Sequence, residues 1–209
     1  LNAITLAAGS NGGTTVFPAG ANSAIIGASN AGTYTATDTG TATTDSLTIS
    51  TTSLAAVDMG NNNAFVFTGL ETVTFDTTTK NATELDVSTV TMTADTGGTT
   101  TLKVVGADTF HASGAITASV IDFSGLTAAA ATVNTANMGV AAVGVTSITG
   151  SPGKDILVGD AKSTIEGGAG NDTIWGDLHN SDEVLTGQDV ARFEGLQKQF
   201  TISRIESTV

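Results

Sequence analysis

The chain has 209 residues, with seven basic against 20 acidic side chains, so its formal net charge at pH 7 is −13. Such an acidic chain is repelled by nucleic acid and by anionic lipid and attracts divalent cations, so we expect no nucleic-acid partner. Cysteine is absent, which excludes disulfides, thiolate metal sites and a thiol nucleophile.

Residues 1–60 are predicted to form a Thr/Ala-rich β region. Thr, Ala, Ser, Gly and Asn dominate, with short apolar insertions such as Ala24-Ile25-Ile26 and Leu47-Thr48-Ile49. Branched Thr side chains fit a pleated surface, and no amphipathic helical pattern of useful length occurs in the first 150 residues. Disorder of about the first 40 residues is the alternative, although a 40% hydrophobic content disfavours it for the chain as a whole.

Residues 61–149 are predicted to form the coils of a parallel β-solenoid, and a β-sandwich is the alternative. Strand-like alternation recurs, as in Val73-Thr74-Phe75 and Val120-Ile121-Asp122-Phe123. An apolar ladder with steps of 17, 18, 18, 19 and 17 residues suggests that each coil stacks one residue on the last; it runs through Leu85, Leu102, Val120, Met138, Leu157 and Ile174. The predicted fold class is therefore all-β.

Residues 150–177 contain a repeat that aligns with itself at a shift of 17. The shift superposes Gly150 on Gly167, Gly153 on Gly170, Asp155 on Asp172 and Asp160 on Asp177. Each copy reads G-x-x-G-x-D-x-U-x with U apolar, and residues 167–175 fit G-G-x-G-x-D-x-U-x without departure. This pattern resembles the calcium-binding repeat of RTX proteins, which predicts a β-roll. Ordinary β-turns marked by Gly and Asp are the alternative.

The positions of this repeat suit calcium. Glycines turn tightly and leave carbonyl oxygens uncovered, and aspartates add charged oxygens for an ion that takes about 6–8 hard oxygen ligands. We expect Asp155 to lie above Asp172 and Asp160 above Asp177. The expected backbone ligands are the carbonyls of Gly150, Gly153, Gly167 and Gly170. The half-turn at residues 159–166 lacks the sixth-position aspartate, which weakens a site on its side.

Residues 178–209 are predicted to form capping strands that cover the open end of the stack. Residues 189–195 and 200–205 supply the two predicted strands, and Phe200 and Ile202 alternate. An exposed end of a sheet would otherwise invite edge pairing.

Two further stretches extend the resemblance. The sequence DVARFEG at 189–195 with Phe200-Thr201-Ile202 resembles a strand module that often follows RTX blocks. Asp45-Ser46-Leu47 and residues 69–75, GLETVTF, resemble the D-x-L and G-(I/L)-E-(T/N)-V-x-(V/F) units of Caulobacter-type S-layer proteins and large RTX adhesins.

The resemblance implies a protein that Gram-negative type I secretion exports unfolded and that folds outside the cell when calcium binds. We expect a calcium-dependent structural protein at the cell surface, most similar to an S-layer segment that self-associates into a lattice. Cell-surface polysaccharide is a further candidate partner. The alternatives are a stalk or binding region of an RTX adhesin and the non-catalytic C-terminal module of a secreted hydrolase. The chain begins at Leu1 without a methionine or signal-peptide pattern, so we expect a piece of a longer or processed protein.

Catalysis is not expected. His111 and His179 are the only histidines and stand in no catalytic motif, and a G-x-S-x-G elbow is absent. His111 is interpreted as a surface strand residue. Asp76, Asp86 and Asp122 follow strand-like residues and could form a carboxylate row, although turn capping is the simpler interpretation. No apolar run approaches the ~20 residues that span a membrane.

Overall fold

The computed structural model shows an all-β chain in which every described element is a strand. It describes residues 2–6, 13–26, 32–50, 57–58, 63–78, 82–107, 109–127, 131–133, 144–159, 163–175 and 190–192. These described residues contain no helix that is long and apolar enough to cross a membrane.

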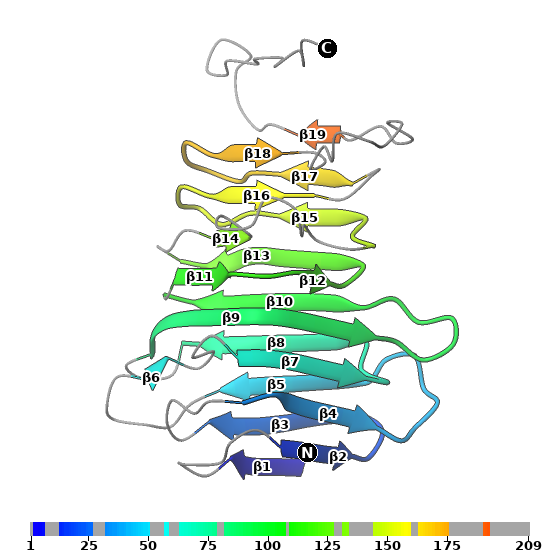
Figure 1. Ribbon diagram of the computed structural model, residues 1–209. Helices are drawn as coiled ribbons and strands as arrows, with labels where there is room; N and C mark the ends of the chain where they lie inside the picture. Colours follow the sequence, from blue (N-terminus) through cyan, green and yellow to red (C-terminus); the bar gives the residue numbers. More distant parts are fainter. Residues whose placement is uncertain are drawn as a thin grey trace.

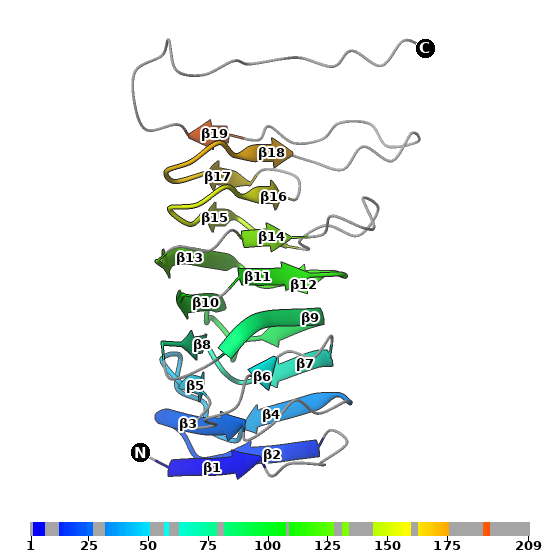
Figure 2. The same ribbon diagram turned by 90° about the vertical axis from the view of Figure 1, so that its left-hand side faces the viewer.

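The strands form two sheets, and the chain moves repeatedly from one to the other (Figures 1 and 2). Sheet A has the described order β1 (Asn2–Leu6), β3 (Ala21–Ile26), β5 (Ser46–Ser50), β8 (Thr72–Thr77), β10 (Thr101–Gly106), β13 (Val120–Leu126), β15 (Ser147–Thr149), β17 (Thr164–Glu166) and β19 (Val190–Arg192). Sheet B has the order β18 (Thr173–Trp175), β16 (Ile156–Val158), β14 (Ala131–Val133), β11 (Thr109–Ala112), β9 (Ala82–Thr93), β7 (Asn63–Thr68), β4 (Tyr34–Asp38) and β2 (Gly13–Phe17). Two short strands, β6 (Val57–Asp58) and β12 (Ile116–Thr117), also pair with β9.

Parallel pairing is found throughout the described strands, as between β5 and β8 and between β7 and β9. Parallel neighbours need a crossover, which each strand of the opposite sheet supplies here. A β-sandwich is typically antiparallel, so the pairing agrees with a β-roll or β-solenoid and not with the sandwich alternative.

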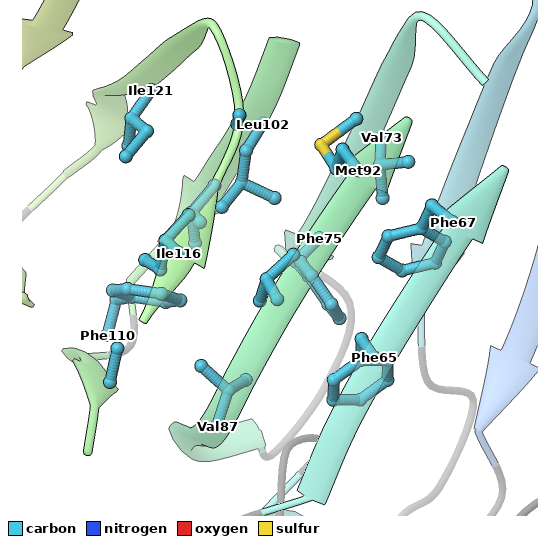
Figure 3. Packing of buried hydrophobic residues seen from close by; sticks show 14 of the residues in the cluster. Phe65, Phe67, Val73, Phe75, Val87, Met92, Leu102, Phe110, Ile116 and Ile121 are labelled. Atoms are coloured by element: carbon cyan, nitrogen blue, oxygen red, sulfur yellow. The ribbon is translucent and has the colours of Figure 1, made fainter. Parts of the chain in front are cut away.

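The core lies between the sheets because side chains alternate along each strand. Strands β5, β8 and β10 all show alternating buried and half-buried positions. Figure 3 shows the buried side chains of the central coils meeting across this interior. Phe65 of sheet B packs edge-on against Phe75 of sheet A, with ring centroids 5.1 Å apart. Phe110 and Phe123 make a similar contact at 4.8 Å.

The predicted apolar ladder is wrong in its first half. Leu85 pairs with Phe110 in sheet B, whereas Leu102 lies in sheet A between Val73 and Ile121. Val120 is one position before Ile121 and is half-buried, because a shift of one residue moves a strand side chain to the other face. Met138 lies outside the described residues. The predicted step from Leu157 to Ile174 is confirmed by the pairing of β16 with β18.

The steady repeat fails because the coils differ in length. Paired positions in sheet A are 29 residues apart from Thr72 to Thr101 but 19 apart from Thr101 to Val120. They are 17 apart from Ser147 to Thr164. Turns of different length absorb the difference, so a fixed period holds only in the C-terminal coils.

Of the two predicted capping strands, one overlaps the described residues. Strand β19 pairs in parallel with β17 and so extends sheet A. The second predicted strand, at residues 200–205, lies outside the described part of the chain.

Candidate metal centre

The turn from β15 to β16 and the turn from β17 to β18 lie directly over one another. Thr149 pairs with Glu166 before these turns, and Ile156 pairs with Thr173 after them. The N–H of Gly150 donates to the Glu166 carbonyl at 2.7 Å, and the N–H of Thr173 donates to the Asp155 carbonyl at 2.8 Å. The repeat of 17 residues is therefore one coil, and equivalent positions of its two copies are neighbours.

Glycine is required where these turns touch. Gly168 and Gly170 have φ values of 86° and 129°, which side chains of L-residues rarely adopt. A Cβ on Gly168 would overlap the Ser151 carbonyl, and a Cβ on Gly170 would overlap the Gly153 carbonyl. A Cβ on Gly150 would likewise overlap the carbonyl of Gly167. Three carbonyl oxygens thus lie in the interface between the turns.

Asp155 is fully buried and closes its own turn. Its Oδ2 accepts a hydrogen bond from the Ser151 N–H at 2.7 Å, and its Oδ1 accepts one from the Ser151 hydroxyl at 2.7 Å. The Ser151 hydroxyl oxygen also accepts the N–H of Gly153 at 3.1 Å. This carboxylate consequently holds the shape of the first turn.

Asp172 links the two turns. Its Oδ1 accepts the N–H of Asp155 at 3.0 Å, and its Oδ2 lies so close over Gly167 that a Cβ there would be 2.5 Å away. Burial raises the pKa of Asp172, and the hydrogen bond from the Asp155 backbone opposes this rise. The side chain remains partly exposed, so a cation could reach it.

The predicted ligands are partly brought together. Asp155, Asp172 and the predicted carbonyls of Gly153 and Gly167 meet where the turns stack, and the Ser151 carbonyl joins them. Asp160 and Asp177 lie outside the described residues, so their predicted stacking stays a prediction. Gly150 and Gly170 supply close backbone contact in this structure. Ser151 was missed because it occupies a variable position of the repeat.

The residues present fit a hard cation. Calcium accepts carbonyl and carboxylate oxygens in a flexible shell, and both kinds of oxygen lie in this interface. Within the described ranges no group of three or more His, Asp or Glu side chains is close enough to hold a metal. Calcium at this corner would therefore depend on the carbonyls of Ser151, Gly153 and Gly167 together with Asp172.

The other carboxylates considered for chemistry do not form a row. Asp76 and Asp122 are in sheet A and are not paired with each other, and Asp86 is in sheet B. The Oδ1 atoms of Asp76 and Asp122 accept hydrogen bonds from the N–H and hydroxyl of Thr78 and Ser124, respectively. These two aspartates cap the ends of their strands, because such local bonds stabilise turns.

His111 lies on β11 beside Asp86 of β9, with its Nδ1 3.1 Å from Asp86 Oδ1. Both side chains are about one-third exposed. This cross-strand pair agrees with the interpretation of His111 as a surface strand residue, while His179 is outside the described residues.

These features define an all-β protein whose stacked glycine turns present backbone and carboxylate oxygens to a cation. Residues 160–180 match the family model of the RTX calcium-binding nonapeptide repeat (four copies). No curated protein and no solved structure matches the chain. The chain thus carries RTX repeats, whose known ligand is calcium. The match begins at residue 160, so the earlier copy at 150–159 rests on the internal repeat and on the stacking of the turns.

Proposed function

We propose that this chain is a calcium-dependent structural segment of an extracellular bacterial surface protein and that it forms part of an S-layer lattice. The observation that carries the proposal is the stacking of the turn at 150–155 on the turn at 167–172, with Asp172 between them. The match to RTX repeats supports calcium as the ligand and secretion from a Gram-negative bacterium by the type I route.

Calcium would act on folding. The acidic residues of the chain outnumber its basic residues by 13, so carboxylates at neighbouring turns repel one another until a cation lies between them. A ligand that binds only the folded state at a hundredfold excess over Kd adds about 2.7 kcal/mol to stability. The calcium-poor cytoplasm would keep the chain unfolded for export, and extracellular calcium would fold it.

The outer faces of the sheets support a lattice role. Small hydroxyl side chains are half-buried at the outward positions of sheet A, among them Ser46, Thr48, Thr72, Thr74 and Thr101. Such flat and weakly charged faces suit side-by-side contact with further copies of the chain or with cell-surface polysaccharide. We propose that the two sheets close into a continuous β-solenoid and that the chain is not an enzyme.

The stalk of an RTX adhesin is the second candidate, because the described strands of sheet A stack in one direction (Figure 2). At about 4.8 Å per strand, nine strands span roughly 40 Å, which suits a spacer. Calcium titration separates the two roles. A lattice protein would form regular two-dimensional sheets in electron micrographs as calcium rises, whereas a stalk would stay extended and monomeric.

The calcium site is tested by changing its aspartates and following the β-signal in circular dichroism during the same titration. We expect Asp155→Ala with Asp172→Ala to abolish the calcium dependence, and Asp76→Ala with Asp122→Ala to leave it unchanged for the same loss of charge. Because Asp155 also holds its own turn, Asp172→Asn alone is the more selective change. It keeps an oxygen for the Asp155 N–H and removes the charge. An unchanged calcium midpoint in Asp172→Asn would show that this corner does not bind the ion.

A further inference from the structure

A second acidic corner lies outside the RTX repeats. It is built from the turns that join β4 to β5, β7 to β8 and β9 to β10, which run from sheet B to sheet A. The loops of the first and last of these turns project from the right-hand edge in Figure 1, whereas the turn from β17 to β18 runs from sheet A to sheet B at the other edge. We call Asp38, Asp45, Glu71 and Asp95 of these turns the acidic corner.

Glu71 ties the three turns together. It is 4% exposed and lies in the short middle turn. Its Oε2 accepts the N–H of Asp45 in the turn before it at 2.9 Å, and its Oε1 accepts the N–H of Asp95 in the turn after it at 3.0 Å. Gly98 lies against the same carboxylate, since a Cβ on Gly98 would be 2.8 Å from Oε1. Both oxygens of Glu71 are thus engaged with backbone.

The three aspartates each retain an oxygen without a partner. Asp38 Oδ1 accepts the N–H of Gly40, and Asp45 Oδ1 accepts the N–H of Gly20. The Oδ2 atoms of Asp38, Asp45 and Asp95 are buried and make no hydrogen bond within the described part of the chain. Asp38 is 5% exposed and Asp45 is 1% exposed. A buried carboxylate oxygen that lacks a partner is costly, so it calls for a cation or a solvent ligand.

No basic side chain neutralises this corner in the described residues. The ion pairs found there join Lys103 to Asp122 and His111 to Asp86. The four carboxylates are close enough to act on one another. Removal from water, followed by the charges of Glu71, Asp38 and Asp45, raises the pKa of Asp95. Four negative charges consequently share one corner.

We propose that the acidic corner binds one calcium ion through the unpartnered oxygens of Asp38, Asp45 and Asp95, with Glu71 as the positioning residue. All of these donors are hard oxygens, which favour calcium or magnesium over softer metals. The three aspartates come from two long turns that flank a short one, and calcium tolerates such an irregular shell better than magnesium does.

Carbonyls and water must complete the shell. Among the described residues no three acidic side chains are near enough to hold a metal by themselves. Calcium commonly fills its remaining positions with backbone carbonyls and water. The buried, unpartnered Oδ2 atoms of Asp38 and Asp45 are the feature that distinguishes this corner from an ordinary acidic surface cluster.

The experiment counts calcium bound to the full 209-residue chain by equilibrium dialysis. Asp38→Asn with Asp45→Asn keeps both Oδ1 acceptors and removes two charges. We expect this variant to bind about one calcium equivalent fewer than the unchanged chain. Asp76→Asn with Asp122→Asn is the matched control, since it removes two charges from strand ends elsewhere and should bind the full complement.

A second measurement separates binding from folding. In chelator we expect Asp38→Asn with Asp45→Asn to melt at a higher temperature than the unchanged chain, because buried repulsion is relieved. Its gain in melting temperature on adding calcium should be smaller. If the double variant does not give the unchanged β-spectrum, Asp95→Asn replaces it, with the same expected loss of one equivalent.

The outcome that overturns the proposal is an unchanged calcium count in these variants. Asp172→Asn provides the independent arm, because it should reduce binding at the RTX repeats and spare the acidic corner. Loss of calcium in Asp172→Asn alone would support the RTX site and reject the acidic corner. Loss in Asp38→Asn with Asp45→Asn alone would do the reverse.

Discussion

At the scale of single residues, the contact between stacked turns depends on atoms that are absent. Gly170 has no Cβ, so the Gly153 carbonyl of the neighbouring turn can approach its Cα. Gly170 also has a positive φ of 129°. Two separate physical demands, on conformation and on space, therefore select glycine at this position.

These two demands can be separated by substitution. Gly144 also has a positive φ, 70°, but a Cβ there would meet no atom within 4 Å. We expect Gly144→Ala to cost roughly 1–2 kcal/mol from conformation alone. Gly170→Ala should cost about 1–3 kcal/mol more, because the added methyl overlaps a carbonyl that must move. Urea unfolding in saturating calcium measures both free energies, and equal losses would contradict the packing argument.

Buried carboxylates show what residue identity alone hides. Asp155 is satisfied by Ser151 within its own turn, whereas Asp45 retains an oxygen without a partner in the described structure. Both aspartates sit beside small and polar residues in the sequence. Their difference depends on which turns lie above and below them.

At the scale of elements, the central strands are joined by aromatic contacts between the sheets. Phe75 of β8 is fully buried and packs edge-on against both Phe65 and Phe67 of β7. Edge-to-face pairs contribute about 0.5–1.5 kcal/mol beyond the area they bury. The region from β7 to β13 therefore has a larger core than the three-residue strands that follow it.

Truncation of this contact should be severe. We expect Phe75→Ala to lower the free energy of unfolding by about 3–5 kcal/mol, because a large cavity opens between the sheets. Val16→Ala is the control, since Val16 is 59% exposed and should change stability by no more than about 0.5 kcal/mol. Chemical denaturation gives both values. A loss at Phe75 as small as that at Val16 would mean that the sheets do not share a core there.

At the scale of the whole molecule, the coils form a nearly one-dimensional stack. Each described strand contacts chiefly the strands before and after it in its own sheet. Stability in such stacks is approximately a sum of local terms and neighbour terms. The C-terminal coils have strands of three residues, so they depend on calcium more than the central coils do.

Hydrogen exchange tests this gradient. When chelator is added in increasing amounts, we expect amides of residues 147–175 to lose protection before those of residues 63–126. The central coils retain a buried aromatic core without calcium, and regions with few apolar contacts open at lower free energy. Loss of protection at the same chelator concentration throughout the described chain would contradict a gradient and would indicate one cooperative unit.

The sequence by itself determined the all-β class and the position of the calcium-binding turns. Alternating apolar residues require strands with one buried face, and a repeat of glycines and aspartates at a shift of 17 requires equivalent turns. These signals are local, so they can be recognised without knowing the partner strand.

Only the tertiary structure decided which coils lie next to one another. The apolar ladder failed between Leu85 and Val120 because turns of unequal length place equally spaced residues in different sheets. For the same reason the convergence of Asp38, Asp45, Glu71 and Asp95 could not be predicted from their spacing. Each turn fixes its own residues, but the length of the chain between turns decides which carboxylates meet.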